Sequence, residues 1–184
     1  MLPFPGALES RRLVIRPAHP SMAEPVNSAI AASFPELHLW MPWAGTLPSV
    51  DATRTFLTVA KQQFDSGTDC PLIVFHKATG ECVGATGLHP RPADPAWREI
   101  GYWIHSEHAG RGLATEMVEA LVAAAVGPLG LAGRQIKASE RNVASQRVAE
   151  KAGFARAGVF DDGRVDPGGI GSRAVVFTRA SGEQ

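Results

Sequence analysis

The segment HAGRGLATEM, residues 108–117, places Gly110 and Gly112 directly before a pattern of helical spacing. Glycine is costly beside a helix unless the backbone must bend unusually or something must approach it closely. In the helical pattern, apolar residues recur at positions 114, 117, 118, 121, 122 and 125. Such a stripe fits a helix that lies on a sheet. The segment therefore predicts a helix that begins after a special turn and ends at Gly127 and Pro128.

The glycine turn has two interpretations. The first amide N–H groups of a helix have no internal partner, and the helix dipole leaves positive character there. A tight turn containing glycine can therefore bind phosphates; the alternative is a strand-to-helix turn that binds nothing. The segment is not a dinucleotide fingerprint, because Thr115 stands where the last glycine is needed, and no Gly-Lys-Ser/Thr of a Walker loop occurs.

Periodicity elsewhere predicts the order strand, two helices, three strands, helix, strand, helix and two strands. The expected strands are 12–16, 71–76, 81–88, 97–105, 134–139, 154–160 and 174–178. The expected helices are 21–33, about 51–65, the one after Gly112, and 142–152. Pro35 is expected to break the chain before an aromatic loop at 37–43, and the prolines of 89–96 predict a second loop. The order favours a single α/β domain with a mixed, mostly antiparallel sheet of about six to seven strands and about four flanking helices.

Composition excludes several classes of partner. The chain has 184 residues, with 18 basic and 18 acidic side chains, so its formal net charge is zero. It lacks the basic field that attracts nucleic acid or anionic membranes, and no apolar run approaches the roughly 18–20 residues of a membrane span. We expect neither nucleic acid nor membrane as a partner. Cys70 and Cys82 have no paired spacing, so we expect both to be reduced and buried in a cytoplasmic protein; a disulfide between neighbouring strands is the alternative.

Two motifs occur in order along the chain, GYWIHSEHAGRGLATEM at 101–117 and NVASQRVAEKAGF at 142–154. They resemble the GNAT family of acetyl-CoA-dependent N-acetyltransferases, and more narrowly the ribosomal-protein N-terminal (Rim-type) branch. The resemblance runs from about Arg12 to Val176 and matches the order of strands and helices. It implies one GNAT-like N-acetyltransferase domain over residues 1–184, with a core of about 12–178.

The resemblance also implies where acetyl-CoA binds as co-substrate. The family's pyrophosphate motif, Gln/Arg-x-x-Gly-x-Gly/Ala, falls on residues 109–114, where Gly112 and Ala114 match and Ala109 departs. In the family, the strand before this loop, here 99–105, splays from the strand after the helix, and the pantetheine arm pairs with its backbone in the gap. The coenzyme-binding residues implied are Trp103, Ile104, His105, Gly110, Arg111, Gly112, Leu113, Ala114, Thr115 and Asn142.

Glu99 is the candidate general base. Amide formation from an amine and a thioester needs a group that accepts the proton of the amine. Period-2 alternation puts Glu99, Gly101 and Trp103 on one face of their strand, and the small Gly101 leaves room there for a substrate or a water. Related enzymes often carry a glutamate in this strand. The alternative is a solvent-facing carboxylate paired with Arg98 or Arg12.

Ser145 is the second candidate catalytic residue, because the resemblance places it near the sulfur of the coenzyme. There it could give a proton or a hydrogen bond to the leaving thiolate; its alternative role is a helix N-cap. The backbone N–H of Ile104 or His105 is the candidate donor to the oxyanion. Trp43 is the candidate substrate-binding residue, since its loop forms one wall of the amine site in this branch. Alternatively, Trp43 caps the core.

The histidines do not predict a metal site. His105 and His108 are spaced i, i+3, but their segment is expected to be a loop, and no third ligand is evident. His89 and His105 could border the substrate cleft or be ordinary strand-end residues.

These observations predict an N-acetyltransferase that works by direct attack in a ternary complex. Its acceptor is a primary amine, either a protein N-terminal α-amine or a small molecule. A ping-pong route is disfavoured, because neither Cys70 nor Cys82 has a neighbour that would clearly activate it. The alternative function is a non-catalytic acyl-CoA-binding or regulatory module on the same fold. Dimers are common in the family, so a homodimer is allowed.

Overall fold

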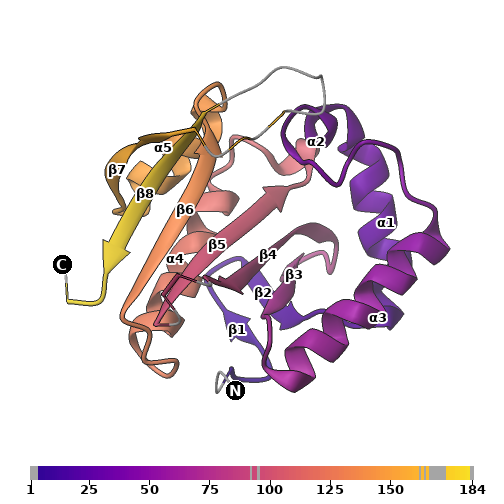
Figure 1. The fold of residues 1–184 in the computed structure, drawn as a ribbon. Coiled ribbons are helices and arrows are strands. Elements are labelled where there is room, and N and C mark those ends of the chain that lie inside the picture. The colour runs from indigo at the N-terminus through magenta and orange to yellow at the C-terminus, as the bar shows by residue number, and fades with distance from the viewer. Residues whose placement is uncertain are drawn as a thin grey trace.

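The computed structural model describes residues 4–91, 93–94, 96–161, 163, 165 and 173–182. One sheet of eight strands runs through it in the order β1-β2-β3-β4-β5-β6-β8-β7 (Figure 1). The strands are β1 (Leu8–Glu9), β2 (Leu13–Pro17), β3 (Pro71–His76), β4 (Cys82–Pro90), β5 (Trp97–Ile104), β6 (Gly133–Ser139), β7 (Ala155–Phe160) and β8 (Ala174–Ala180). The helices are α1 (Ala23–Ala32), α2 (Phe34–Trp40), α3 (Val50–Ser66), α4 (Leu113–Val126) and α5 (Val143–Lys151), with short 3-10 turns at η1 (Pro20–Met22) and η2 (Ser106–His108).

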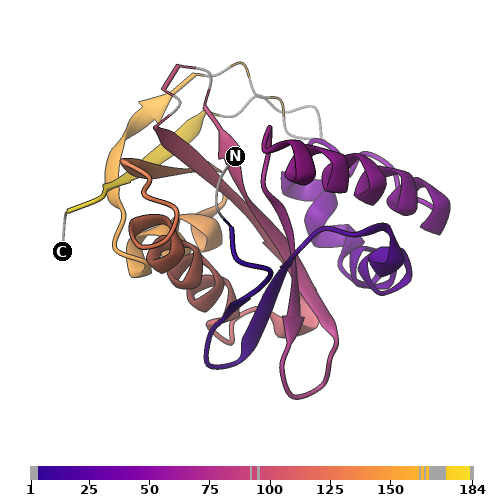
Figure 2. The ribbon, with the colours of Figure 1, turned by 90° about the horizontal axis from the view of Figure 1, so that it is seen from below.

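The helices cover both faces of the sheet, with α4 and α5 on one face and α1 and α3 on the other (Figure 2). Each face has its own hydrophobic core. The core under α4 and α5 includes Met117, Leu121, Ile136 and Phe177. The core under α1 and α3 includes Val26, Leu57, Ile73 and Trp103. Successive residues of a strand point to opposite faces, so each side chain of β5 belongs to one of these two environments.

The pairing of β5 with β6 positions the candidate site. These strands are parallel, whereas the other neighbouring strands of the sheet are antiparallel. Their register begins at Trp97 and ends where Glu99 lies opposite Gln135. Both strands continue, β5 to Ile104 and β6 to Ser139, but they diverge (Figure 1). We call the opening between the unpaired parts of β5 and β6 the splay.

The predicted fold class is confirmed, with more elements than expected. The structure has eight strands and five α-helices among its described residues, against about six to seven and about four. The additional helix α2 occupies the region expected to contain a chain break and an aromatic loop. Pro35 stands in the first turn of α2, where a helix needs no proline N–H, so it starts the helix instead of breaking the chain. The additional strand β1 has two residues.

The start of the loop expected at 89–96 is also corrected. Strand β4 continues through His89 and Pro90, which lie opposite Glu99 and Arg98 in β5. A proline is tolerated at the end of a strand, where its missing N–H interrupts little of the ladder. His89 is therefore held on a rigid strand beside Glu99.

The cysteines agree with the sequence prediction. Cys70 and Cys82 are both free and buried. Burial raises the pKa of the Cys70 thiol to about 12 and that of Cys82 to about 11. Among the described residues, no helix is both long enough and apolar enough to cross a bilayer.

Candidate active site

The glycines before α4 adopt the conformation that explains their presence. Gly110 has φ 74° and Gly112 has φ 76°, both in the left-handed region that residues with a Cβ rarely adopt. A Cβ on Gly110 would have no atom within 4 Å, and one on Gly112 would meet only Arg12 Nη2, at 3.6 Å. The glycines are therefore needed for the backbone shape, and the space above them is open.

The loop presents unpaired backbone donors to that space. Within the described part of the chain, the amides from Gly110 to Thr115 have no hydrogen-bond acceptor. Leu113 is buried in the core, so it offers a ligand only its amide. The first free amides of α4 and the positive end of its dipole could hold an anion. A shallow groove of about 600 Å³, lined by Gly112, Thr115 and Lys151 among others, adjoins it.

A charged pair from distant parts of the chain holds this loop. Arg12 Nη1 donates to the carbonyl oxygen of Arg111 at 3.0 Å, while Arg12 Nε donates to Glu116 Oε2 at 2.7 Å. Glu116 Oε1 also accepts from the Ser10 hydroxyl and from the Arg12 amide, each at 2.7 Å. Arg12 is thus the partner of Glu116 and not of Glu99. The sequence offered no signal for this pair, because its members lie 104 residues apart.

Replacing Glu116 with alanine is expected to lower the free energy of unfolding by about 1–3 kcal/mol, because charge-assisted hydrogen bonds are lost. Burial raises the pKa of Glu116, but the hydrogen bonds from Ser10 and Arg12 outweigh it and hold the pKa below the usual 4.5. The stabilisation is therefore present above the unfolded-state pKa and disappears as pH falls through the folded-state pKa. Denaturant unfolding at pH 7 should give a lower free energy of unfolding for the variant than for the wild type. Under acid the two free energies should become equal. Glu119→Ala, an exposed change on α4, is the control.

Glu99 lies at the narrow end of the splay. Its Oε2 accepts from Gln135 Nε2 at 2.7 Å and lies 3.4 Å from Lys137 Nζ, both on β6. In the described part of the chain its Oε1 has no partner. The alternative partners proposed from the sequence, Arg98 and Arg12, are replaced by Lys137. One carboxylate oxygen is anchored and the other is free to accept a proton.

A hydroxyl pair lies on the opposite side of β5. Tyr102 Oη is 2.9 Å from Ser145 Oγ and donates to the Ser145 carbonyl oxygen at 3.1 Å. Burial raises the pKa of Tyr102 to about 12, against a smaller lowering by Ser145, so this phenol stays protonated near neutral pH. The sequence reasoning missed Tyr102, although strand alternation does place it on the face opposite Glu99.

The N-cap of α5 is Asn142 and not Ser145. Asn142 Oδ1 accepts from the Ser145 amide at 3.0 Å, so the alternative role considered for Ser145 belongs to Asn142. The Asn142 side-chain NH2 remains a donor, and the Ser145 hydroxyl is fixed beside Tyr102.

At the end of β5, one of the two amides predicted to donate a hydrogen bond to the oxyanion is already in use. The amide of His105 donates to the carbonyl oxygen of Val83 at 2.9 Å, so it is already occupied and cannot be the free donor. Ile104 is the last residue of β5 and remains the candidate of the two. Trp103 is 9% exposed and packs into the core under α1 and α3.

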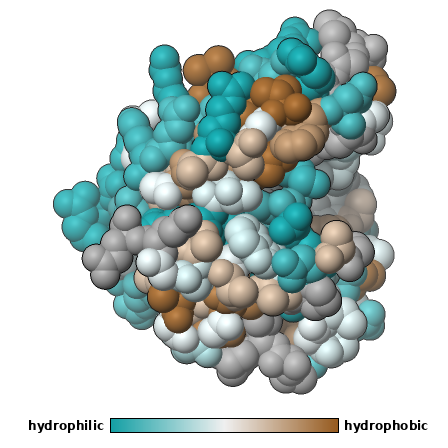
Figure 3. All heavy atoms as spheres, turned by 60° about the vertical axis from the view of Figure 1, so that its left-hand side comes forward, coloured by the Kyte–Doolittle hydropathy of each residue, from teal (hydrophilic) through white to brown (hydrophobic). Residues whose placement is uncertain are grey.

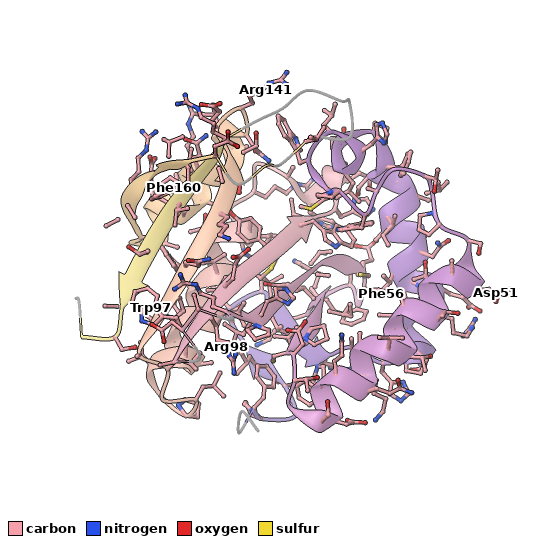
Figure 4. All side chains as sticks on the ribbon, viewed as in Figure 1. Asp51, Phe56, Trp97, Arg98, Arg141 and Phe160 are labelled. Atoms are coloured by element: carbon pink, nitrogen blue, oxygen red, sulfur yellow. The ribbon has the colours of Figure 1, made fainter. Side chains whose placement is uncertain are left out.

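A cavity of about 460 Å³ opens on the α1 and α3 side of β5. Its lining is mostly apolar and includes Trp43, Phe56, Trp103, Met41, Val26 and Ile30. Trp43 is 50% exposed and Phe56, on α3 (Figure 4), is 63% exposed. In the described ranges, no group of three or more His, Cys, Asp or Glu side chains could hold a metal ion.

The space that Gly101 leaves is filled by a residue of this cavity. A Cβ on Gly101 would lie 3.2 Å from His89 Nε2. The sequence predicted room there for a substrate or a water, and the imidazole of His89 occupies it instead.

The fold and the site together define an acetyltransferase. Residues 12–155 match the acetyltransferase (GNAT) domain, so the chain belongs to the GNAT acetyltransferase family. The family and the enzyme class predicted from the two motifs are confirmed.

Three individual proteins are similar to this chain. The chain is 29% identical over 157 residues, 84% of each chain, to the putative ribosomal N-acetyltransferase YdaF of Bacillus subtilis strain 168. RimL, described as a ribosomal L7/L12 alpha-N-protein acetyltransferase in complex with coenzyme A, superposes with a TM-score of 0.86 over 95% of this chain and 97% of that one, at 19% identity. The microcin C7 self-immunity acetyltransferase MccE, in complex with acetyl-CoA and AMP, gives 0.84 over 93% of both chains at 17% identity. The two superpositions show that the chain shares its fold with RimL and MccE.

Proposed function

We propose that this protein transfers an acetyl group from acetyl-CoA to a primary amine by direct attack in a ternary complex. The observation that carries the proposal is the loop of unpaired amides from Gly110 to Thr115 beside the open end of the splay. RimL and MccE, which share the fold, are described as complexes with coenzyme A and acetyl-CoA.

In this proposal, the pyrophosphate lies on the amides of the loop and the pantetheine arm enters the splay. The unpaired edge of β5 at Trp103 and Ile104, followed by His105, supplies backbone groups to the arm. Arg111 adds positive charge, and the side-chain NH2 of Asn142 donates to the coenzyme. Ala114, which matches the family's pyrophosphate motif, has a small side chain that leaves room for the phosphates.

The proton acceptor and the proton donor lie on opposite faces of the sheet. We propose that the free Oε1 of Glu99 accepts a proton from the amine nitrogen on the α1 and α3 side. Ser145, backed by the protonated Tyr102, gives a proton or a hydrogen bond to the leaving thiolate on the α4 and α5 side. This route uses no cysteine, in keeping with the burial and raised pKa of Cys70 and Cys82.

The acceptor that we propose is a protein N-terminal α-amine. YdaF and RimL are both named for ribosomal-protein acetylation. The cavity contains no Asp or Glu among its lining residues, so it offers little to a polycationic acceptor. Its apolar walls favour an uncharged first residue in contact with Trp43.

We also propose that the whole chain forms one N-acetyltransferase domain and works in the cytoplasm. Two copies pair through the side of the molecule that carries the edge strand β7. Phe160, at the end of β7 (Figure 4), is 52% exposed, and the face that Figure 3 brings forward shows hydrophobic residues among hydrophilic ones. Light scattering after size-exclusion chromatography should give a dimer mass, and Phe160→Glu should lower it to that of a monomer.

Calorimetric titration with acetyl-CoA tests the proposal, and micromolar binding is expected. Release of the coenzyme thiol should then be followed with peptide amides that begin with Ala, Ser, Met or Phe, with peptides already acetylated at the N-terminus as the control. Peptides with an apolar first residue should give the highest kcat/KM. Binding without transfer to a broad panel of amines would instead support the non-catalytic module, and no binding would refute the coenzyme site.

A further inference from the structure

A histidine–carboxylate pair lies beside the acceptor cavity. His89 Nδ1 is 2.9 Å from Asp69 Oδ1 and 3.0 Å from Asp69 Oδ2. Asp69 Oδ1 also accepts from the Cys70 amide at 2.7 Å, so the carboxylate is itself fixed. Because an ionised carboxylate only accepts hydrogen bonds, Nδ1 of the neutral ring carries the proton and Nε2 carries the lone pair.

Two glycines leave space for this ring on the face of the sheet. A Cβ on Gly87 would lie 2.6 Å from both Cε1 and Nε2 of His89, and a Cβ on Gly101 would lie 3.2 Å from Nε2. The imidazole therefore lies flat over β4 and β5, on the face shared by Glu99 and Trp103. A Cβ at position 87 would clash with the ring, and one at position 101 would make it shift slightly.

The lone pair of Nε2 is available to a ligand. Within the described part of the chain, Nε2 has no hydrogen-bond partner, and the side chain is 40% exposed. Among the residues that line the cavity, only His89 and Tyr102 are ionisable. The Tyr102 hydroxyl is bonded to Ser145, so among the residues that line the cavity His89 is the ionisable one that still has an unbonded polar atom.

The Glu99 carboxylate and the His89 ring lie opposite each other but point in different directions. His89 and Glu99 lie directly opposite each other in the register of β4 and β5. The Glu99 carboxylate turns to Gln135 and Lys137 at the splay, whereas the ring of His89 turns toward Gly101. Among the described residues, the charged or titratable groups near the ring include Asp69 with Cys70 beside it, Glu99 and, across Glu99, Lys137. Arg98 lies near Cys70, and α1 and α3 contribute no Asp, Glu, Lys or Arg to the cavity lining.

We propose that His89, oriented by Asp69, takes the first proton from the ammonium form of the acceptor; this inference rests on the proposed function. An ammonium group must lose two protons to become an amide nitrogen. The first moves to His89 Nε2, giving an imidazolium that Asp69 stabilises and a neutral amine that attacks the thioester carbonyl. The second leaves the nitrogen through Glu99 as the C–S bond breaks. The protons taken by His89 and Glu99 both pass to solvent, while the thiolate takes its proton from Ser145, which regains one from solvent, so the net reaction releases one proton.

His89→Gln tests this role, because glutamine can still donate to Asp69 but cannot take the proton. The variant must bind its acceptor as the neutral amine, whose fraction falls tenfold per unit below a peptide α-amine pKa of about 7.7–8.0. We expect kcat/KM for the best peptide amide of the panel to fall about tenfold at pH 7, where roughly a tenth of the α-amine is neutral. Near pH 9 it should match the wild type.

Three comparisons separate the outcomes. His19→Gln, an exposed histidine outside the cavity, should leave the profile unchanged. An aromatic amine, neutral throughout this pH range, should lose nothing in His89→Gln. Asp69→Asn should show the same pH pattern as His89→Gln, with a smaller loss.

A loss that is equal at pH 6 and pH 9, or that extends to the aromatic amine, would assign His89 a packing role and overturn the proposal. If the wild type binds no acetyl-CoA or transfers no acetyl group, the proposed function fails before this inference is reached.

Discussion

Gly112→Pro is expected to abolish measurable binding of acetyl-CoA. Proline fixes φ near −65°, whereas Gly112 has φ 76°, so the turn that exposes the loop amides cannot form. Each charge-assisted hydrogen bond to the pyrophosphate is worth about 1.5–3 kcal/mol, and losing two of them would weaken binding by about 100-fold or more. Calorimetry with acetyl-CoA measures the effect directly.

A milder pair of variants shows whether the effect is local. Gly112→Ala forces a Cβ into the left-handed region, which costs roughly 1–2 kcal/mol. Gly130→Ala imposes the same strain at φ 58°, with no atom within 4 Å of the added Cβ, in the connection between α4 and β6. Both should lower the melting temperature, but only Gly112→Ala should weaken coenzyme binding. Equal dissociation constants for the two variants would contradict the assignment of the loop.

Glu99→Gln is expected to lower kcat/KM by about 10²–10⁴-fold, the usual contribution of a positioned general base. Glutamine keeps the size of the side chain and an oxygen that can accept from Gln135, but it cannot take a proton. The dissociation constant of acetyl-CoA should stay near that of the wild type, because the carboxylate lies on the acceptor side of the splay. Initial rates of thiol release across pH 6–9 provide the measurement.

The shape of that profile distinguishes Glu99 from His89. The loss in Glu99→Gln should persist over the whole range, since the second proton must leave the nitrogen at every pH. Glu24→Gln, which changes an exposed carboxylate on α1, is the matched control and should retain full activity. Full activity of Glu99→Gln at every pH would remove Glu99 from the mechanism.

Features carried by neighbouring residues could be predicted from the sequence. The apolar stripe on α4 follows from the spacing of a helix. The glycines before α4 and the asparagine before α5 follow from the backbone shape and capping that a helix N-terminus needs. The strand pattern at 97–105 likewise separates Glu99 from Tyr102 by face. These local rules are sufficient to place the expected coenzyme loop at the N-terminus of α4.

Pairs that form across the fold could not be predicted in this way. Arg12 meets Glu116 across 104 residues, Tyr102 meets Ser145 across 43, and His89 meets Asp69 across 20. Each depends on which strands become neighbours and on a bend or extension that the pattern alone does not fix. The extension of β4 beyond its expected end at Leu88, for example, is what puts His89 on the sheet instead of in a loop.

The short register between β5 and β6 has a mechanical consequence. The sheet consists of a five-stranded part, β1 to β5, and a three-stranded part, β6 to β8, joined by the pairs from Trp97 to Glu99. A pantetheine arm that pairs with the open edge of β5 would act as a strand supplied by the ligand. The two parts should therefore rock against each other in the free protein and become one stiff sheet when the coenzyme is bound. Slower hydrogen exchange at the amides of β5 beyond Glu99 would record that change.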